Sequence, residues 1–167
     1  MAVGDAYKLE YKTLKDPYTG VEFLKLTDSR GNTIHPYFTQ PLFSSNGETI
    51  LLTSDRTGEW QLYKLDIPDR IITQLTDDRQ VHPHAPCLDG RNMIAYYWSG
   101  RLLKSVDLET LENGKVEQRP LCRHNTSWSR AHHSHPHLIF TPDDKWVIFS
   151  SNREGCCNVY MAPVVWE

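Results

Sequence analysis

The sequence lacks the features that mark several large classes of protein. No apolar run approaches the roughly 20 residues that a transmembrane helix requires. With 18 basic and 21 acidic residues, the net charge of −3 gives no sign of a surface for nucleic acid or membrane. The N-terminus, Met1 to Asp5, has neither the basic nor the apolar stretch of a secretory signal. These absences favour a cytoplasmic protein without nucleic-acid or membrane partners.

Common catalytic and redox motifs are missing as well. No nucleophile elbow, phosphate-binding loop or His-Glu-x-x-His pair occurs. No segment shows the apolar periodicity of an amphipathic helix. The cysteines lack Cys-x-x-Cys spacing and are expected to be free thiols: Cys87, Cys122, Cys156 and Cys157. The unusual residue is histidine, since five of the eight histidines lie between His124 and His137.

The sequence contains an internal repeat of β-strand patterns. A polar turn followed by an apolar run at residues 43–58 recurs at 140–155, and a weaker copy begins at Cys87. In each copy Gly, Asn or Asp supplies the turn, and the aliphatic and aromatic residues that follow are typical of a buried strand. Four short antiparallel strands in about 40–45 residues have the length of one β-propeller blade. The alternative is an unrelated β-meander that happens to repeat.

The repeat predicts an all-β fold, a single β-propeller-type domain over residues 1–167. We expect about three four-stranded antiparallel blades, at roughly 33–77, 80–118 and 132–165. A further strand at about 20–28 has no blade of its own, and in a closed propeller such a strand can cover the edge of the last blade. Because known propellers have roughly four to eight blades, three cannot close a ring. The open edges of this incomplete array favour self-association.

Two parts of the sequence have a more specific pattern than the repeat. Residues 32–45 (Asn-Thr-Ile-His-Pro-Tyr-Phe-Thr-Gln-Pro-Leu-Phe-Ser-Ser) and 52–58, together with the opening 4–10, resemble the first blade of the oligogalacturonate lyase family. His135-Pro136-His137 and the turn at 140–145 resemble its last blade. The resemblance implies a seven-bladed propeller of which this chain has the two ends without the middle. It also implies a lyase of pectin degradation that cleaves short oligogalacturonides by β-elimination, although activity in so short a chain is doubtful.

The resemblance also implies a divalent metal site, with Mn²⁺ as the expected ion. The proton α to the uronate carboxylate is weakly acidic, so its removal requires a cation on the carboxylate and a general base. His135 and His137 match the paired metal ligands of the family, and His132 stands where the family has a glutamine ligand. The general base and substrate arginine of the family have no counterpart that we identify. The alternative for this cluster is a solvated loop or an adventitious metal binder.

A shorter form of the same signature precedes the middle repeat. Gln80, His82 and His84 are a possible second metal site, and the alternative is a polar loop between blades. The first copy supplies His35 and Gln40 as possible substrate contacts, and the alternative for His35 is a packing or loop residue.

Arg56 is a third possible substrate contact, because a guanidinium group binds carboxylates with two hydrogen bonds. Arg56 and Arg153 share one turn position of the repeat, which favours a structural role instead. For the whole chain, the alternative function is a non-catalytic, TolB-like propeller fragment that binds protein or sugar. Metal binding would distinguish the two.

Overall fold

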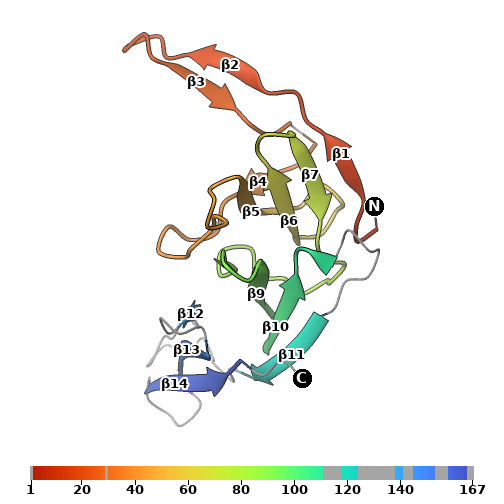
Figure 1. Cartoon of the computed structure of the whole chain (residues 1–167), viewed down its shortest axis with the longest axis vertical. Helices are drawn as coiled ribbons and strands as arrows, with labels where there is room; N and C mark the ends of the chain where they lie inside the picture. The colour runs from red at the N-terminus through yellow and green to blue at the C-terminus, as the bar shows by residue number, and fades with distance from the viewer. Residues whose placement is uncertain are drawn as a thin grey trace.

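The computed structural model describes residues 2–28, 30–110, 118–123, 138–140, 145–152 and 158–164. The described residues form fourteen strands in three antiparallel sheets and one separate hairpin. The three sheets follow one another along an arc, and none of the described sheets closes on itself (Figure 1). This architecture confirms the predicted all-β, propeller-type fold. No helix in the described part of the chain is long and apolar enough to span a bilayer.

The first blade is a five-stranded sheet in the order β1-β7-β6-β5-β4. Its strands are β4 (Thr33–Ile34), β5 (Thr49–Ser54), β6 (Gln61–Asp66), β7 (Ile71–Gln74) and β1 (Ala6–Lys8). The turn before β5 requires a left-handed residue, and Gly47 supplies it with φ of 74°. The apolar run that follows is buried, as the repeat predicts.

The N-terminal segment places two elements around this blade. Strand β1 pairs with β7 and covers the outer edge of the first blade. The predicted strand at 20–28 contains β3 (Glu22–Lys25), which pairs with β2 (Lys12–Lys15) in a hairpin. In the described residues β3 therefore belongs to this projecting hairpin and to no blade (Figure 1).

The second and third blades are smaller. The second has the order β11-β10-β9-β8, and the third has the order β12-β13-β14. The strands of the second are β8 (Cys87–Asp89), β9 (Ile94–Ser99), β10 (Leu102–Asp107) and β11 (Gln118–Arg123). Those of the third are β12 (Leu138–Phe140), β13 (Trp146–Ser151) and β14 (Asn158–Pro163).

Strand β9 lies at the centre of the core and is buried at every residue. Because side chains alternate across a strand, Tyr96 and Trp98 pack toward the third blade and Tyr97 packs toward the first. Trp98 meets Phe149 edge to face, with ring centroids 5.7 Å apart. One continuous aromatic strand thus joins the three blades.

Candidate functional site

The entry segment of the second blade, residues 80–84, is held by bonds to the hairpin between β9 and β10. The Gly100 amide donates to the Gln80 carbonyl, and the His82 amide donates to the Trp98 carbonyl, both at 2.9 Å. These bonds place the predicted Gln80–His82–His84 group on a fixed main chain.

The first blade holds the same segment from the other side. The Thr53 hydroxyl donates to the Pro83 carbonyl at 2.9 Å and lies 3.5 Å from the Ile34 carbonyl. The Tyr37 amide donates to the His84 carbonyl at 2.9 Å. The entry segments of the first blade (residues 35–41) and the second blade therefore lie side by side.

Asp78 anchors the start of the second entry segment. Its carboxylate accepts hydrogen bonds from Lys104 Nζ at 2.5 Å and from the Gln80 amide at 3.1 Å. The Gln61 side chain forms two hydrogen bonds with the Asp78 main chain. Its amide nitrogen donates to the Asp78 carbonyl, and its amide oxygen accepts from the Asp78 N–H. Burial alone would raise the pKa of Asp78, but the hydrogen bonds from Lys104, Ser99 and Gln80 hold it below its usual value. The anchor is therefore ionised at neutral pH.

His82 and His84 have ring centroids 6.2 Å apart at an interplanar angle of 72°. The His84 amide donates to His82 Nδ1 at 3.4 Å. The role of His82 and His84 as metal ligands stays a prediction.

His35 lies in the entry segment of the first blade. Its Nδ1 lies 2.6 Å from the carbonyl oxygen of Pro36. Because a carbonyl can only accept, Nδ1 carries a proton, and in the neutral ring Nε2 keeps its lone pair. This tautomer is the one found in metal-ligating histidines and in histidines that act as bases.

Gln40 lies in the same entry segment and is 7% exposed. Its amide oxygen is buried and has no hydrogen-bond partner among the described residues. A buried acceptor without a donor is costly. The substrate contact that the sequence suggests for Gln40 stays a prediction.

Arg56, by contrast, is enclosed within the first blade. Its side chain is 1% exposed, and its Nη2 lies 3.4 Å from Asp28 Oδ1. The guanidinium carbon sits 5.1 Å from the Tyr7 ring centroid and 5.3 Å from that of Tyr63. Burial lowers the pKa of this guanidinium. These contacts favour a structural role for Arg56.

A cavity of about 530 Å³ opens beside Gln80. Arg101 and Arg123 line it together with Gln80, Gly100 and Leu102. The two arginines come together because Leu102 pairs with Arg123 across β10 and β11. Guanidinium groups of this kind bind carboxylates.

Sequence reasoning named Gln80 but missed both arginines. A signal for Arg101 was present, because Ser99-Gly100-Arg101 has the Ser-x-Arg spacing of Ser54-Asp55-Arg56. No comparable signal marks Arg123, which reaches the cavity through strand pairing.

The principal predicted metal site, His132, His135 and His137, lies outside the described residues, as does Arg153. In the part of the chain that the structure describes, no group of three or more His, Cys, Asp or Glu side chains could hold a metal ion. The second predicted group, Gln80, His82 and His84, contains only two such residues.

Residues 1–122 match the family model of oligogalacturonate lyase. The chain belongs to the oligogalacturonate lyase family. It is 32% identical over 121 residues to an oligogalacturonide lyase of Pectobacterium atrosepticum. The aligned residues cover 72% of this chain and 31% of that relative. This family match confirms the resemblance; the likeness of residues 123–163 to the last blade lies beyond the matched stretch and stays a prediction.

Two solved structures share the fold. An oligogalacturonate lyase in complex with manganese superposes with a TM-score of 0.74 at 24% identity, over 90% of this chain and 38% of that one. TolB from Acinetobacter baumannii superposes with a TM-score of 0.62 at 17% identity, over 89% of this chain and 34% of that one. The chain spans about a third of the length of the curated relative it matches.

Proposed function

We propose that this protein takes part in metal-assisted β-elimination of short, pectin-derived galacturonides, which makes it a carbon–oxygen lyase. The observation that carries the proposal is the family match over residues 1–122. This stretch contains both entry segments and every residue that lines the cavity except Arg123, which follows it directly. The name of the Pectobacterium relative, an oligogalacturonide lyase, supports the substrate class.

The described residues have two roles in this proposal. Arg101 and Arg123, with Gln80 beside them, hold a uronate carboxylate in the cavity, because a guanidinium group and a carboxylate form paired, charge-assisted hydrogen bonds. In its neutral form, His35 presents Nε2 with a lone pair, so it can accept a proton or bind a cation.

A divalent ion, when bound, would supply positive charge to the uronate carboxylate and so acidify the neighbouring C–H. The related structure in complex with manganese supports this choice of metal. The predicted ligands are His132, His135 and His137, and the tautomer of His35 suits a further ligand.

The metal proposal is tested by titrating the chain with Mn²⁺ and following the loss of the free-ion electron paramagnetic resonance signal. We expect His135→Ala and His137→Ala each to abolish tight binding. His133→Ala is the matched control, since His133 lies in the same run but has no proposed ligand role. Equal loss in all three variants would contradict the assignment.

The activity is tested by the ultraviolet absorbance of unsaturated uronides after mixing the chain with digalacturonate and Mn²⁺. A rise that depends on both additions supports the proposal, and no rise removes the claim of activity for this chain. A folded chain that binds neither Mn²⁺ nor oligogalacturonide would favour the alternative, a non-catalytic binding module. The cytoplasmic location and self-association through open sheet edges stay predictions.

A further inference from the structure

An exposed aromatic side chain, Phe38, lies at the tip of a turn in the entry segment of the first blade. The turn is closed by the Gln40 amide, which donates to the Tyr37 carbonyl at 2.9 Å. Phe38 and Thr39 occupy its two central positions, and the Phe38 side chain is 75% exposed. Such positions usually hold Gly, Pro, Asn, Asp or Ser, so backbone preferences do not explain a phenylalanine here.

The second blade fixes this turn at both ends. The Tyr37 amide donates to the His84 carbonyl at 2.9 Å, and the Leu88 amide donates to the Pro41 carbonyl at 2.8 Å. The Tyr37 ring also lies beside the Phe38 ring, with centroids 4.7 Å apart and planes tilted by 37°. Because the turn is already held in place, a ligand that binds Phe38 loses little affinity to ordering of the protein.

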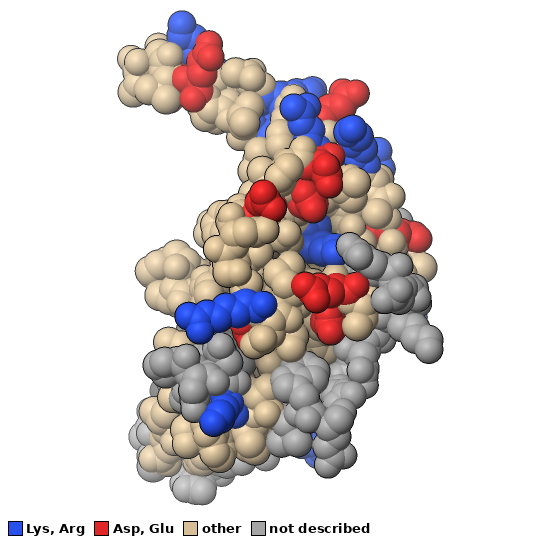
Figure 2. Space-filling model, viewed as in Figure 1, with Lys and Arg blue, Asp and Glu red and all other residues tan. Residues whose placement is uncertain are grey.

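The turn lies on the inner side of the arc that the blades form. The segment between β4 and β5 is on that side in Figure 1, and Figure 2 shows mainly residues other than Lys, Arg, Asp and Glu there. His84, which the turn binds, follows four residues after Gln80, and Gln80 lines the arginine-lined cavity. Four residues of extended chain span at most about 14 Å. A short oligosaccharide can therefore reach from that cavity to Phe38.

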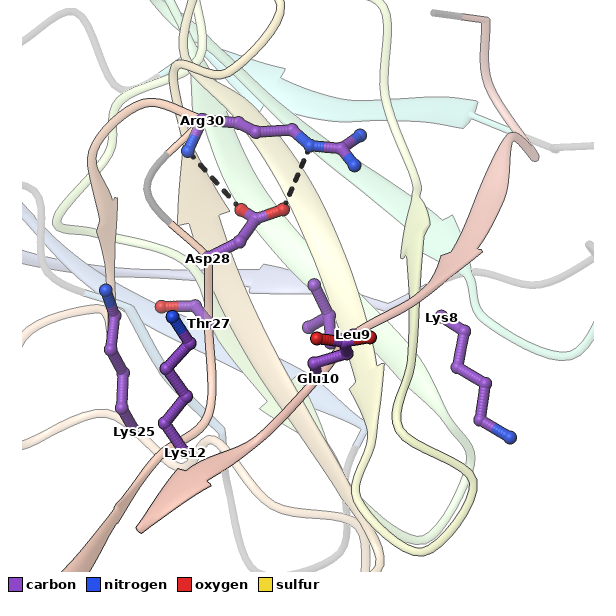
Figure 3. A pocket seen from close by; sticks show the side chains of 8 residues that line it. All are labelled: Lys8, Leu9, Glu10, Lys12, Lys25, Thr27, Asp28 and Arg30. Carbon is purple, nitrogen blue, oxygen red and sulfur yellow. Dashed lines mark hydrogen bonds and ion pairs between the residues drawn. The ribbon is translucent and has the colours of Figure 1, made fainter. Parts of the chain in front are cut away.

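A second cavity, of about 450 Å³ at the base of the β2–β3 hairpin, has a different character. Its lining residues, drawn in Figure 3, are mostly Lys, Arg, Glu and Asp. Lys12 and Lys25 among them are direct partners in the β2–β3 register, and Asp28 is bound by Arg30 Nε at 3.1 Å. No aromatic residue of the described chain lines this cavity. It therefore lacks a surface on which a sugar ring stacks.

The chemistry of a galacturonide ring suits an exposed aromatic side chain. In this ring the C–H bonds at C3, C4 and C5 point to one face and form an apolar patch. The face of an aromatic ring carries partial negative charge, so it attracts these C–H groups and shields them from water. A protein partner is a poorer match for Phe38, because a stable protein interface buries about 800 Å² on each side, several times the area of one aromatic side chain.

We propose that Phe38 is a stacking surface for one sugar ring of an oligogalacturonide whose carboxylate, on another ring, binds Arg101 and Arg123. The inference rests on the proposed function for the identity of the sugar, and it adds a binding residue outside the cavity. It also gives the site a preference for length, because only a ligand of several rings reaches both places. Trigalacturonate should therefore bind more tightly than galacturonate.

The test is calorimetric titration of the full chain with galacturonate and with trigalacturonate, without added metal. Phe38→Leu keeps an apolar side chain but removes the aromatic face, and Phe38→Tyr keeps that face. Phe23→Leu is the matched control, since Phe23 is 49% exposed on β3 and belongs to neither entry segment. We expect Phe38→Leu to weaken trigalacturonate binding about fivefold, the effect of one aromatic contact. Phe38→Tyr and Phe23→Leu should change it little.

Proton magnetic resonance of the ligand supplies a readout that a purely structural role would not change. The C3, C4 and C5 protons of one bound sugar ring should shift upfield, because they lie over an aromatic face, and this shift should be absent with Phe38→Leu. Since Phe38 is largely exposed, its substitution should leave the thermal unfolding midpoint unchanged.

Unchanged trigalacturonate affinity in Phe38→Leu, equal losses in Phe38→Leu and Phe23→Leu, or no saturable binding to the unmodified chain would overturn the proposal. If sedimentation shows that Phe38→Leu abolishes self-association while trigalacturonate affinity is unchanged, the turn is a contact between copies of the chain and the proposal is wrong. The absorbance assay for β-elimination measures turnover and not affinity. A negative result there removes the claim of activity and leaves these outcomes unchanged.

Discussion

In both the first and the second blade, a Ser-x-Arg sequence follows the long central strand. In the first blade its arginine, Arg56, is 1% exposed and lies between Tyr7 and Tyr63. In the second blade Arg101 is exposed and lines an open cavity with Arg123. The same turn residue thus serves packing in one blade and is available to a ligand in the other.

The difference comes from what each blade adds to the repeat. Strand β1 pairs with the outer strand of the first blade and brings Tyr7 over Arg56. The second sheet, in its described residues, has four strands and no such addition. A position within a repeat therefore does not decide function by itself, because elements outside the repeat determine which copies remain accessible.

The central strands differ in a similar way. Thr53 of the first blade and Trp98 of the second occupy the position next to the Ser of the Ser-x-Arg sequence. The Thr53 hydroxyl bonds the Pro83 carbonyl, whereas Trp98 packs edge to face on Phe149. The first contact between blades is polar and fixes an entry segment, and the second is apolar and joins the core.

We expect the largest loss of stability from a substitution that removes the apolar contact between Trp98 and Phe149. Trp98→Ala should lower the free energy of unfolding by about 3–5 kcal/mol, because it leaves a large cavity beside Phe149. Thr53→Val keeps the shape and should cost about 1 kcal/mol. Urea unfolding followed by circular dichroism measures both. Similar losses in the two variants would mean that the two contacts between blades do not differ as described.

The next effect concerns the two arginines. Arg56→Met should lower the free energy of unfolding by about 2–3 kcal/mol, since it removes charge-assisted bonds to Asp28 and to the hydroxyl groups of Ser54 and Thr33. Arg101→Met should change it by less than about 0.5 kcal/mol. Thermal unfolding of the two variants compares them directly. A large loss in Arg101→Met would show that both turns are structural.

For ligand affinity, in contrast to stability, the arginine of the second blade should matter more than that of the first. Arg101→Ala is expected to weaken digalacturonate binding about tenfold, because one guanidinium–carboxylate contact is lost. Arg79→Ala is the control, since Arg79 is an exposed arginine of the same region that does not line the cavity. Titration calorimetry measures both affinities. If Arg79→Ala weakens binding equally, general electrostatic attraction explains the effect and the cavity does not.

The smallest effect is on the pH dependence of stability. The folded pKa of Asp78 lies below its ordinary value of 3.8, so its ionised carboxylate contributes stability above that value. This contribution is lost as the pH falls through the lower folded pKa. Asp78→Asn should therefore be less stable at pH 7 and lose less stability than the unmodified chain on acidification below about pH 4. Asp77→Asn, at an exposed neighbour, should keep the original acid profile.

Part of the candidate site was predictable from sequence. The Gln80-to-His84 signature and His35 could be located because short motifs next to β-strands keep their place in a repeat. The orientation of the His35 ring could not be predicted, since it depends on the Pro36 carbonyl that lies beside Nδ1. Arg123 was missed because strand pairing across β10 and β11, and not spacing along the chain, brings it to the cavity.

The amino-acid sequence by itself determined the β-strands and the repeat, because turn residues and alternating apolar residues act over a few neighbouring positions. It also contained the family signature in residues 1–122. Only the tertiary structure decided that β1 buries Arg56, that Arg101 stays open, and that Lys12 faces Lys25 across the hairpin. These outcomes depend on contacts between segments distant in sequence or paired across strands, and local preferences do not specify which surfaces such contacts cover.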